Sequence, residues 1–493
     1  MTFDLRTILL FAAAALLYSA FLPIKWRGWA LLIASILALY WLQPKPPFIR
    51  FSDFVFPTAT LALTVIGWWF TLPRNVSAQD DSVSRSFKRD DLFTFGLIVA
   101  LVMGLAFTRY LAPELRLTSR PPNPLHVALI LAILGGIIAL VTFIRRKRAR
   151  FPLLTALILL IIGLFIVLKT EPLAAGLSRV WRIQTGQNPD LASITDVAGW
   201  LGFSYIAFRL IHTLRDRQSG KLPALSLREY VTYVIFFPSI IAGPIDRAER
   251  FAKDFRALPE VIGLAAPRLV EGGTRITVGI FKKFVVADSL ALGLALNVTN
   301  AEQATSAGAL WMLMYGYALR LFFDFSGYSD IAIGIGILFG IKLPENFDRP
   351  YLKSDIASFW QSWHITLGTW ARFYVFTPLS RMLLSRDPKP SSTVIVLTTQ
   401  IATMTIIGLW HGVTLNFFIW GVWHGLGLFV HKQWSDRTRK WYLSLKGKPL
   451  QKRAWTFFGW LLMFHFVVLG WVWFALPEVG QSLRVFAGLF GLA

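Results

Sequence analysis

Three tryptophan–histidine pairs in the second half of the chain carry the side chains best suited to chemistry. They are Trp363-His364, Trp410-His411 and Trp423-His424. A neutral imidazole can accept a proton from a hydroxyl group near neutral pH, because its ordinary pKa is about 6.5. All three pairs lie in or beside apolar segments, where a charged group costs roughly 2.5–3.5 kcal/mol. The pattern therefore indicates a proton-transfer site at membrane depth.

The spacing of these pairs does not decide which histidine reacts. His411 lies between Trp410 and Gly412, and Gly408 with Gly412 forms a small-xxx-small pair that lets a helix or a ligand approach closely. His424 lies in a second Trp-His-Gly triplet and can line the same cavity from the next helix. His364, taken alone, fits a hydrogen-bonded histidine of an amphipathic helix as well as a catalytic one.

An acidic, glycine-containing segment lies inside another apolar stretch. It reads Asp324-Phe-Ser-Gly-Tyr-Ser-Asp330, and its candidate site residues are Asp324, Ser326, Tyr328 and Asp330. The two aspartates are six positions apart and would not share a face of a regular helix. Ser326 and Gly327 favour a broken or locally unwound helix, which is tolerated at membrane depth where it lines a cavity. The alternative is a buried aspartate that holds two helices together.

Residues 356–374 have the pattern of an amphipathic helix. Their apolar residues recur at helical spacing and include Trp360, Trp363 and Trp370, while Gln361 and Arg372 lie largely elsewhere. Such a helix lies in the membrane interface or lines an internal cavity, and tryptophan suits both places. We therefore expect Trp360 and Trp363 near the reactive histidines.

Several mechanisms lack their residues in this sequence. The chain contains no cysteine, which excludes disulfides and a cysteine acyl-enzyme. It has no G-x-x-x-x-G-K-[ST] segment for a nucleotide phosphate and no H-E-x-x-H segment. The histidines have no carboxylate at metal-ligand spacing. We therefore expect neither a metal site nor a bound cofactor.

The composition is that of a polytopic membrane protein. Of 493 residues, 55% are hydrophobic and 16% are charged, whereas a soluble protein has about 25% charged residues. About eleven to thirteen apolar segments reach the length of a span. They are 7–22, 27–43, 52–72, 91–110, 124–144, 152–169, 192–213, 226–243, 275–295, 308–340 (one span or two), 393–410, 413–431 and 456–476.

The net charge of +23 is explained by basic loops on the cytoplasmic side of a cell membrane. The basic residues form no single face, so we do not expect nucleic-acid binding. The loops 145–150 and 432–453 are predicted to be cytoplasmic, and 295–307 extracytoplasmic. Residues 1–190 are mostly simple apolar spans, whereas 191–493 hold the polar and histidine-bearing ones. The polar segment 74–90 is predicted to be a loop.

From about 195 to 476 the sequence resembles the membrane-bound O-acyltransferase (MBOAT) family, in its bacterial branch. The shared motifs are Gly202-Phe-Ser-Tyr205, Phe236-Phe-Pro238, Ala242-Gly-Pro-Ile245, Asp324–Asp330, Pro344-Glu-Asn-Phe347, Phe359-Trp360, Trp363-His364, Gly408-Leu-Trp-His-Gly412, Trp420-Gly421 and His424-Gly425. The resemblance selects His411 as the catalytic histidine and His364 as a second recurrent one. The chain departs from the family at Ala371-Arg-Phe-Tyr-Val-Phe376, and the resemblance does not cover residues 1–190.

The resemblance implies a ring of spanning helices around a tunnel that narrows at His411. It implies transfer of an acyl group, most simply acetyl, from a cytoplasmic thioester such as acetyl-CoA to a hydroxyl of an extracytoplasmic glycan or cell-envelope polymer. Membrane lipids surround such a protein, and an SGNH-hydrolase-like acyltransferase outside the membrane is the partner implied. Trp410, Asn416 and His424 join the tunnel candidates, with Asn416 and His364 as candidate oxyanion donors. The alternative is a transporter or lipid flippase that uses the intramembrane Asp and His residues.

Overall fold

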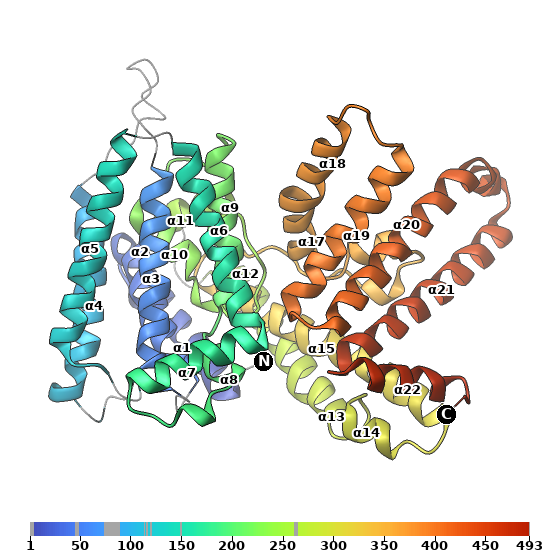
Figure 1. The fold of residues 1–493 in the computed structure, drawn as a ribbon, viewed down its shortest axis with the longest axis horizontal. Coiled ribbons are helices and arrows are strands. Elements are labelled where there is room, and N and C mark those ends of the chain that lie inside the picture. The colour runs from blue at the N-terminus through green and yellow to red at the C-terminus, as the bar shows by residue number, and fades with distance from the viewer. Residues whose placement is uncertain are drawn as a thin grey trace. The chain divides into compact units, whose positions relative to one another are not determined.

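The protein is built of helices joined by loops in this computed structural model (Figure 1), which confirms the all-α prediction. The structure describes residues 4–44, 49–72, 89–112, 114, 117–118, 121–147, 150–260 and 265–492. Within these ranges the one β-type pairing is an isolated bridge between Phe347 and Trp363. The predicted loop 74–90 lies outside the described residues up to position 88, as do positions 148 and 149 of the basic segment 145–150.

The chain divides into two compact units. Unit 2 contains residues 6–272 with 335–343, and unit 1 contains residues 1–5, 273–334 and 344–493. The division predicted at residue 190 rests on the change from simple apolar spans to spans with polar residues, and it stays a prediction.

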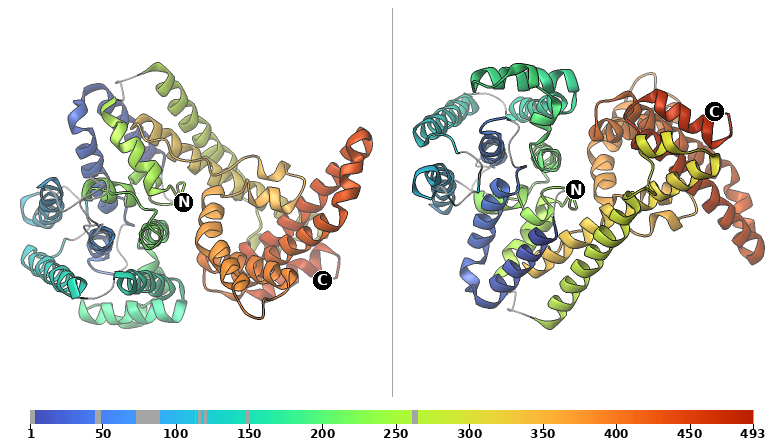
Figure 2. Two further views of the ribbon diagram at one scale, coloured as in Figure 1. Left: turned by 90° about the horizontal axis from the view of Figure 1, so that it is seen from above. Right: turned by 90° about the horizontal axis from the view of Figure 1, so that it is seen from below.

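Unit 2 is a bundle whose central helix is α3 (Figure 2). Its helices are α1 (Leu5–Phe21), α2 (Arg27–Trp41), α3 (Ser52–Thr71), α4 (Arg89–Leu111), α5 (Pro124–Lys147), α6 (Arg150–Lys169), α7 (Glu171–Gln184), α8 (Ile194–Ala198), α9 (Phe203–Gln218), α10 (Leu227–Val234), α11 (Ala248–Ala257) and the start of α12 (Ala266–Ile280). Helix α3 contacts α2, α6, α9 and α10. Gly67 allows this packing, because a Cβ there would meet the Tyr230 hydroxyl at 3.0 Å.

The expected span 226–243 is wrong, because the chain there is a short helix followed by a break. Helix α10 ends at Val234, and a 3₁₀ turn over Phe237–Ser239 follows. Pro238 has no N–H and cannot continue the α-helical hydrogen bonds. The carbonyls that this break releases are bound by Arg209, a buried side chain that donates to Val234 O at 2.8 Å and Ser239 O at 3.0 Å. A buried guanidinium thus replaces helical hydrogen bonds.

The expected span 192–213 is likewise divided. It forms α8 and α9, separated by residues 199–202. Gly202 has φ 74°, and a Cβ at this position would lie 2.6 Å from Ile240 O. The close approach and the left-handed backbone both require glycine, which explains the Gly202-Phe-Ser-Tyr205 motif in local terms.

Unit 1 holds the helices that carry the candidate chemistry, drawn from yellow to red in Figure 1. They are the end of α12, α13 (Asp288–Ala291), α14 (Val298–Gln303), α15 (Ala307–Leu338, whose last turn belongs to unit 2), α16 (Ile356–Trp360), α17 (Ile365–Ala371), α18 (Thr377–Leu384), α19 (Ser392–His411), α20 (Leu415–Ser444), α21 (Pro449–Ala475) and α22 (Val479–Leu489). A π-helical segment, Phe281–Ala287, follows α12, and another, Arg372–Phe376, follows α17.

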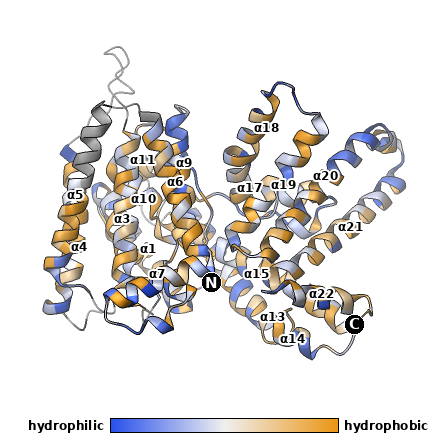
Figure 3. Ribbon diagram, in the orientation of Figure 1, coloured by the Kyte–Doolittle hydropathy of each residue, from blue (hydrophilic) through white to orange (hydrophobic). Residues whose placement is uncertain are grey.

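Six helices in the described part of the chain are long and apolar enough to cross a membrane. They are α3, α4, residues 152–169 of α6, α15, α19 and α21. Figure 3 shows hydrophobic residues along α3, α4 and α6. Helix α1 and residues 124–136 of α5 are shorter apolar helices. The chain is thus a multi-pass membrane protein.

Helix α15 is continuous, so the expected break near Gly327 is wrong. It runs through Asp324, Gly327 and Asp330 without interruption. Gly327 serves close packing instead, because a Cβ there would lie 2.8 Å from Gly279 O on α12. The irregular backbone lies on the facing segment, in the π-helix Phe281–Ala287. The small residue therefore brings two helices together.

The single amphipathic helix expected at 356–374 is also wrong. The segment forms α16 and α17, which are separated at residues 361–364. His364 has φ 44°, in the left-handed region that a non-glycine residue rarely adopts. Such a conformation persists where the surroundings fix it, and strained residues of this kind gather at functional sites. The break therefore occurs at a histidine singled out for its chemistry.

Candidate active site

His411 is the last residue of α19, where the chain turns into α20. The backbone becomes extended at Gly412, and the Thr414 side chain caps the start of α20. Helices α19 and α20 pack closely because Gly408 has no side chain: a Cβ there would lie 2.2 Å from Phe417 O. The predicted close approach at Gly408 is confirmed. It holds the His411 ring at the junction of two helices.

Aromatic rings surround His411. Ring centroids lie 4.4 Å away at Trp410, 4.7 Å at Phe474, 5.8 Å at Trp420 and 5.9 Å at Phe417. The side chain is only partly buried, unlike that of His364 or His424. A partly exposed imidazole in an apolar wall can meet a hydroxyl that enters from outside the protein.

His424 lies on α20, fully buried behind Trp420. Trp420 stands between the two histidines, with its ring 4.9 Å from His424 and 5.8 Å from His411. Trp360 lies 5.1 Å from His424. Neither ring nitrogen of His424 has a hydrogen-bond partner among the described residues, and the same holds for the indole N–H of Trp360 and Trp420. A buried polar group without a partner is costly and calls for an explanation.

His364 is held by the loop that carries the Pro344-Glu-Asn-Phe347 motif. Asn346 Oδ1 accepts hydrogen bonds from the Thr366 hydroxyl at 2.7 Å and from the Thr366 backbone N–H at 3.3 Å. Because this atom accepts from a backbone N–H, it is the amide oxygen and not the nitrogen. His364 Nδ1 lies 3.2 Å from the same oxygen, so Nδ1 carries a proton and donates it in a hydrogen bond. In the neutral imidazole Nε2 then bears the lone pair, and this atom is buried without a partner among the described residues.

Trp410 lies near both His364 and His411. The Trp410 ring is 6.2 Å from His364 and 4.4 Å from His411. The structure thus brings together three predicted site residues from two segments of the chain. Trp360 joins them through His424, whereas Trp363 packs against Phe347 at 5.2 Å in the surrounding aromatic cluster.

The aspartates of α15 lie in ion pairs. Asp330 accepts from Arg275 at 2.7 Å and from Lys282 at 2.6 Å, and Asp324 pairs with Lys283 at 2.8 Å. All three cations come from α12 and the π-helix that follows it. This arrangement matches the alternative of aspartates that hold helices together. These basic partners went unnoticed in the sequence, although they lie among the polar residues of an expected span, 275–295.

Ser326 and Tyr328 are buried on the same helix. The Ser326 hydroxyl has no hydrogen-bond partner among the described residues. Phe325 lies between Asp324 and Ser326 in the sequence. Its ring centroid is 4.7 Å from that of His364. Helix α15 therefore contacts His364 through an aromatic residue of the acidic motif.

Asn416 is a predicted oxyanion donor whose amide group is engaged within the protein, and its role stays a prediction. Its amide nitrogen donates to Leu476 O at 2.6 Å and to the Ser482 hydroxyl at 3.2 Å. Both N–H groups are therefore used. Asn416 ties the start of α20 to the connection between α21 and α22, two residues beyond Phe474, which contacts His411.

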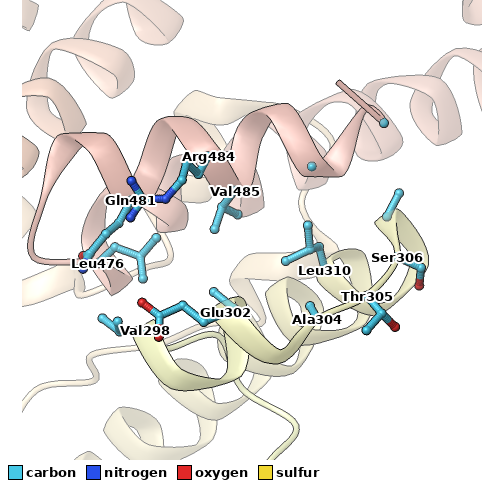
Figure 4. Close-up of a pocket in the computed structure, with 14 residues that line it drawn as sticks. Val298, Glu302, Ala304, Thr305, Ser306, Leu310, Leu476, Gln481, Arg484 and Val485 are labelled. Atoms are coloured by element: carbon cyan, nitrogen blue, oxygen red, sulfur yellow. The ribbon is translucent and has the colours of Figure 1, made fainter. Parts of the chain in front are cut away.

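A cavity of about 580 Å³ lies on the other side of that connection (Figure 4). Its walls come from α22, from α14, from the start of α15 and from the segment that joins α14 to α15. Leu476, held by Asn416, forms part of the wall. Glu302 points from the lower wall toward α22, which carries Gln481 and Arg484. A carboxylate, an amide and a guanidinium thus surround one cavity near the chain that supports His411.

Asn346 is the functional residue that sequence analysis missed. It is fully buried and orients His364. Its signal was present, because an asparagine in a Pro-Glu-Asn-Phe motif within a membrane protein needs polar partners. Among the described residues, no group of three His, Asp or Glu side chains is placed to hold a metal ion.

Known proteins resemble this chain over the region that forms the site. The model of the MBOAT, membrane-bound O-acyltransferase family matches residues 154–470. The chain is 33% identical over 298 residues to a probable alginate O-acetylase of Pseudomonas syringae pv. tomato, covering 60% of this chain and 53% of the relative.

The names of two other relatives refer to polymers other than alginate. A peptidoglycan O-acetyltransferase of Helicobacter pylori is 35% identical over 264 residues, covering 54% of this chain and 47% of the relative. A teichoic acid D-alanyltransferase of Streptococcus thermophilus is 31% identical over 299 residues, covering 58% of this chain and 71% of the relative. The chain spans about half the length of the O-acetylating relatives.

Proposed function

This chain belongs to the membrane-bound O-acyltransferase family, and from that premise we propose that it transfers an acyl group to a hydroxyl, with His411 as general base. The observation that carries the proposal is the placement of His411 at the α19–α20 junction, partly exposed within an aromatic wall. The donor is an acyl thioester on the cytoplasmic side, most simply acetyl-CoA. The acceptor is a hydroxyl of an extracytoplasmic glycan or cell-envelope polymer, as the names of the relatives suggest.

The chemistry needs a base and a fixed geometry. The acceptor oxygen attacks the thioester carbonyl, and His411 removes the hydroxyl proton as the C–O bond forms. The carbon–sulfur bond then breaks, and the thiolate leaves with the proton that His411 returns. A thioester is reactive enough for this without further activation. The tryptophan and phenylalanine rings exclude water, so that orientation of the two substrates supplies much of the rate.

His364 is the second histidine in the proposed reaction. Because Asn346 fixes the Nδ1 proton, neutral His364 presents a lone pair at Nε2. It is therefore placed to accept a hydrogen bond and not to donate one to an oxyanion. We propose that His364 Nε2 accepts a hydrogen bond from a substrate group and so positions that group near Trp410, whose ring lies close to both histidines.

The ion pairs of α15 favour an enzyme over the transporter or flippase alternative. A permeation path needs polar groups that can exchange partners along the membrane. Asp330 is instead held by two cations and Asp324 by one. These contacts support a structural role for both aspartates.

A partner outside the membrane completes the proposed function. The cavity beside Glu302 and Arg484 lies on the segment 295–307 that is predicted to be extracytoplasmic. It is too small for a polymer, and we propose that an SGNH-hydrolase-like acyltransferase passes the acyl group from this side to the polymer. Deleting that partner should abolish polymer acylation and leave thioester turnover measurable. Full polymer acylation by the purified chain alone would contradict this part.

The proposal is tested by incubating the purified protein with labelled acetyl-CoA and an excess of a hydroxyl acceptor. We expect ester product from the wild type and a loss of about 10²–10⁴-fold in His411→Ala. His126→Ala, an exposed histidine of α5, is the matched control and should keep the wild-type rate. His424→Ala should be milder than His411→Ala. An active His411→Ala with an inactive His424→Ala would overturn the choice of base.

A further inference from the structure

Unit 2 contains an apolar cavity that no step of the acyl transfer uses. Its volume is about 480 Å³, and its walls come from α1, α2, the 3₁₀ turn at Phe237 and the residue Phe339. Leu17 and Phe21 on the rim are 60% and 79% exposed. Large apolar side chains exposed on a membrane helix face hydrocarbon, so the cavity is accessible to a lipid chain.

The buried hydroxyl-bearing side chain of Tyr18 lines this cavity. Tyr18 is only 8% exposed, and its hydroxyl is buried without a hydrogen-bond partner among the residues described. A buried hydroxyl without a partner costs about 1–3 kcal/mol. Its ring is fixed by Phe339, 4.9 Å away. The hydroxyl therefore stands where a ligand can complete its hydrogen bonding.

Two arginines lie beside Tyr18. The Arg27 guanidinium is 5.8 Å from the Tyr18 ring centroid, and Arg27 is 4% exposed at the first turn of α2. Arg268, at the start of α12, is close enough to act on the Tyr18 hydroxyl electrostatically. Burial lowers the pKa of Arg268, and the positive charge of Arg27 lowers it further.

The position of this cluster fits the edge of a membrane. It lies at the turn between α1 and α2, where Lys25 and the half-exposed Trp26 follow the apolar residues of α1. Tryptophan and lysine are common at the interface between hydrocarbon and headgroups. One end of the site is therefore apolar and the other is cationic.

We propose that unit 2 binds one anionic phospholipid, with an acyl chain in the cavity and the phosphate between Arg27, Arg268 and the Tyr18 hydroxyl. Two guanidinium groups match the charge and the oxygen geometry of a phosphate. A zwitterionic lipid has an ammonium group that opposes them. This site is independent of the acyl-transfer proposal.

The test is thermal unfolding of the purified full chain in neutral detergent, followed by tryptophan fluorescence with added lipid. Phosphatidylglycerol should raise the midpoint by several degrees in a saturable manner, because a ligand of the folded state stabilises it. Phosphatidylcholine at the same mole fraction should raise it far less. Inorganic phosphate separates the two sources of the anion: protection by phosphate equal to that by phosphatidylglycerol would overturn the lipid site.

Variants locate the effect. Arg268→Gln should weaken the apparent affinity for phosphatidylglycerol at least tenfold, and Ala34→Phe, which fills the apolar part, should do the same without changing charge. Arg179→Gln on the exposed face of α7 removes the same charge and should leave the response intact. Tyr18→Phe should weaken binding about threefold. An Arg268→Gln protein with a wild-type response, or an Arg179→Gln protein that loses it, would contradict the proposal.

Discussion

Buried histidines in the two units differ in how their ring nitrogens are satisfied. In unit 2, His212 has both nitrogens bound, Nδ1 to the Tyr233 hydroxyl at 3.1 Å and Nε2 to Asp216 at 3.0 Å. In unit 1, His424 has no partner at either nitrogen and His364 has none at Nε2, among the residues described. The two types of histidine are equally buried.

We propose from this difference that the buried histidines with unsatisfied nitrogens face a substrate, whereas the satisfied ones serve the fold. A protein interior normally satisfies its polar atoms, and exceptions collect where a substrate supplies the missing partner. His465 in unit 1 is an example of a satisfied histidine, because the Tyr315 hydroxyl and Leu461 O are hydrogen-bond partners of its two ring nitrogens.

The largest effect should come from exchanging one histidine of each type for alanine. His364→Ala should lower kcat about 100-fold, because the hydrogen-bond acceptor that positions a substrate group is lost. His212→Ala should instead destabilise the protein by about 1–3 kcal/mol, since Asp216 and Tyr233 lose a buried partner. Initial rates normalised to folded protein, together with unfolding midpoints, separate the two outcomes. A His212→Ala protein with full stability and lost activity would reverse the comparison.

The sequence was sufficient for the features that depend on residue type. The helical fold and the membrane class follow from hydropathy, and side-chain chemistry singled out the three Trp-His pairs. It failed where backbone geometry depends on distant contacts. Residues 356–374 have a continuous helical pattern, yet the chain breaks at His364 because Asn346 and Thr366 hold it there. Gly327 predicted a break in α15, whereas it serves packing against Gly279.

The second largest effect is expected on stability, from the Arg209 hydrogen bonds at the end of α10 in unit 2. Arg209→Met should lower the free energy of unfolding by about 3 kcal/mol, because the carbonyls of Val234 and Ser239 are left without a donor. Arg215→Met, on the same helix but exposed, removes an equal charge and should cost less than about 0.5 kcal/mol. Denaturation in detergent, measured on both proteins, checks the difference. Equal stability of the two variants would show that Arg209 does not support the break.

A smaller effect is expected from the residue that orients His364. Asn346→Ala should lower kcat about tenfold with little change in KM, because the hydrogen bond that fixes the imidazole tautomer is lost, worth about 1–2 kcal/mol. Asn346→Asp, which keeps the accepting oxygen, should recover most of the rate. Steady-state kinetics of the two variants give the comparison. A change in KM alone, without rescue by aspartate, would assign Asn346 to substrate binding.

The smallest effect is a pH dependence in unit 2. Burial alone would raise the pKa of Asp196, but hydrogen bonds from Arg182 and Ser178 outweigh it and hold the pKa below its ordinary value. The Arg182 contact is 2.8 Å long and joins α7 to α8.

A carboxyl whose pKa is lower in the folded state stabilises the protein above its unfolded pKa of about 3.9, and this contribution is lost as the pH falls through the folded value. The unfolding midpoint of wild type should therefore fall between about pH 4 and pH 2 more steeply than that of Asp196→Asn, in which this proton uptake is removed. At pH 7 the variant should be less stable by roughly 1–3 kcal/mol, because Arg182 keeps its charge and loses this ion pair. Parallel pH profiles for the two proteins would show that Asp196 does not contribute to the acid sensitivity. Because His364 and His424 lie in the other unit and take no part in this pair, the same titration leaves the contrast between satisfied and unsatisfied histidines unchanged.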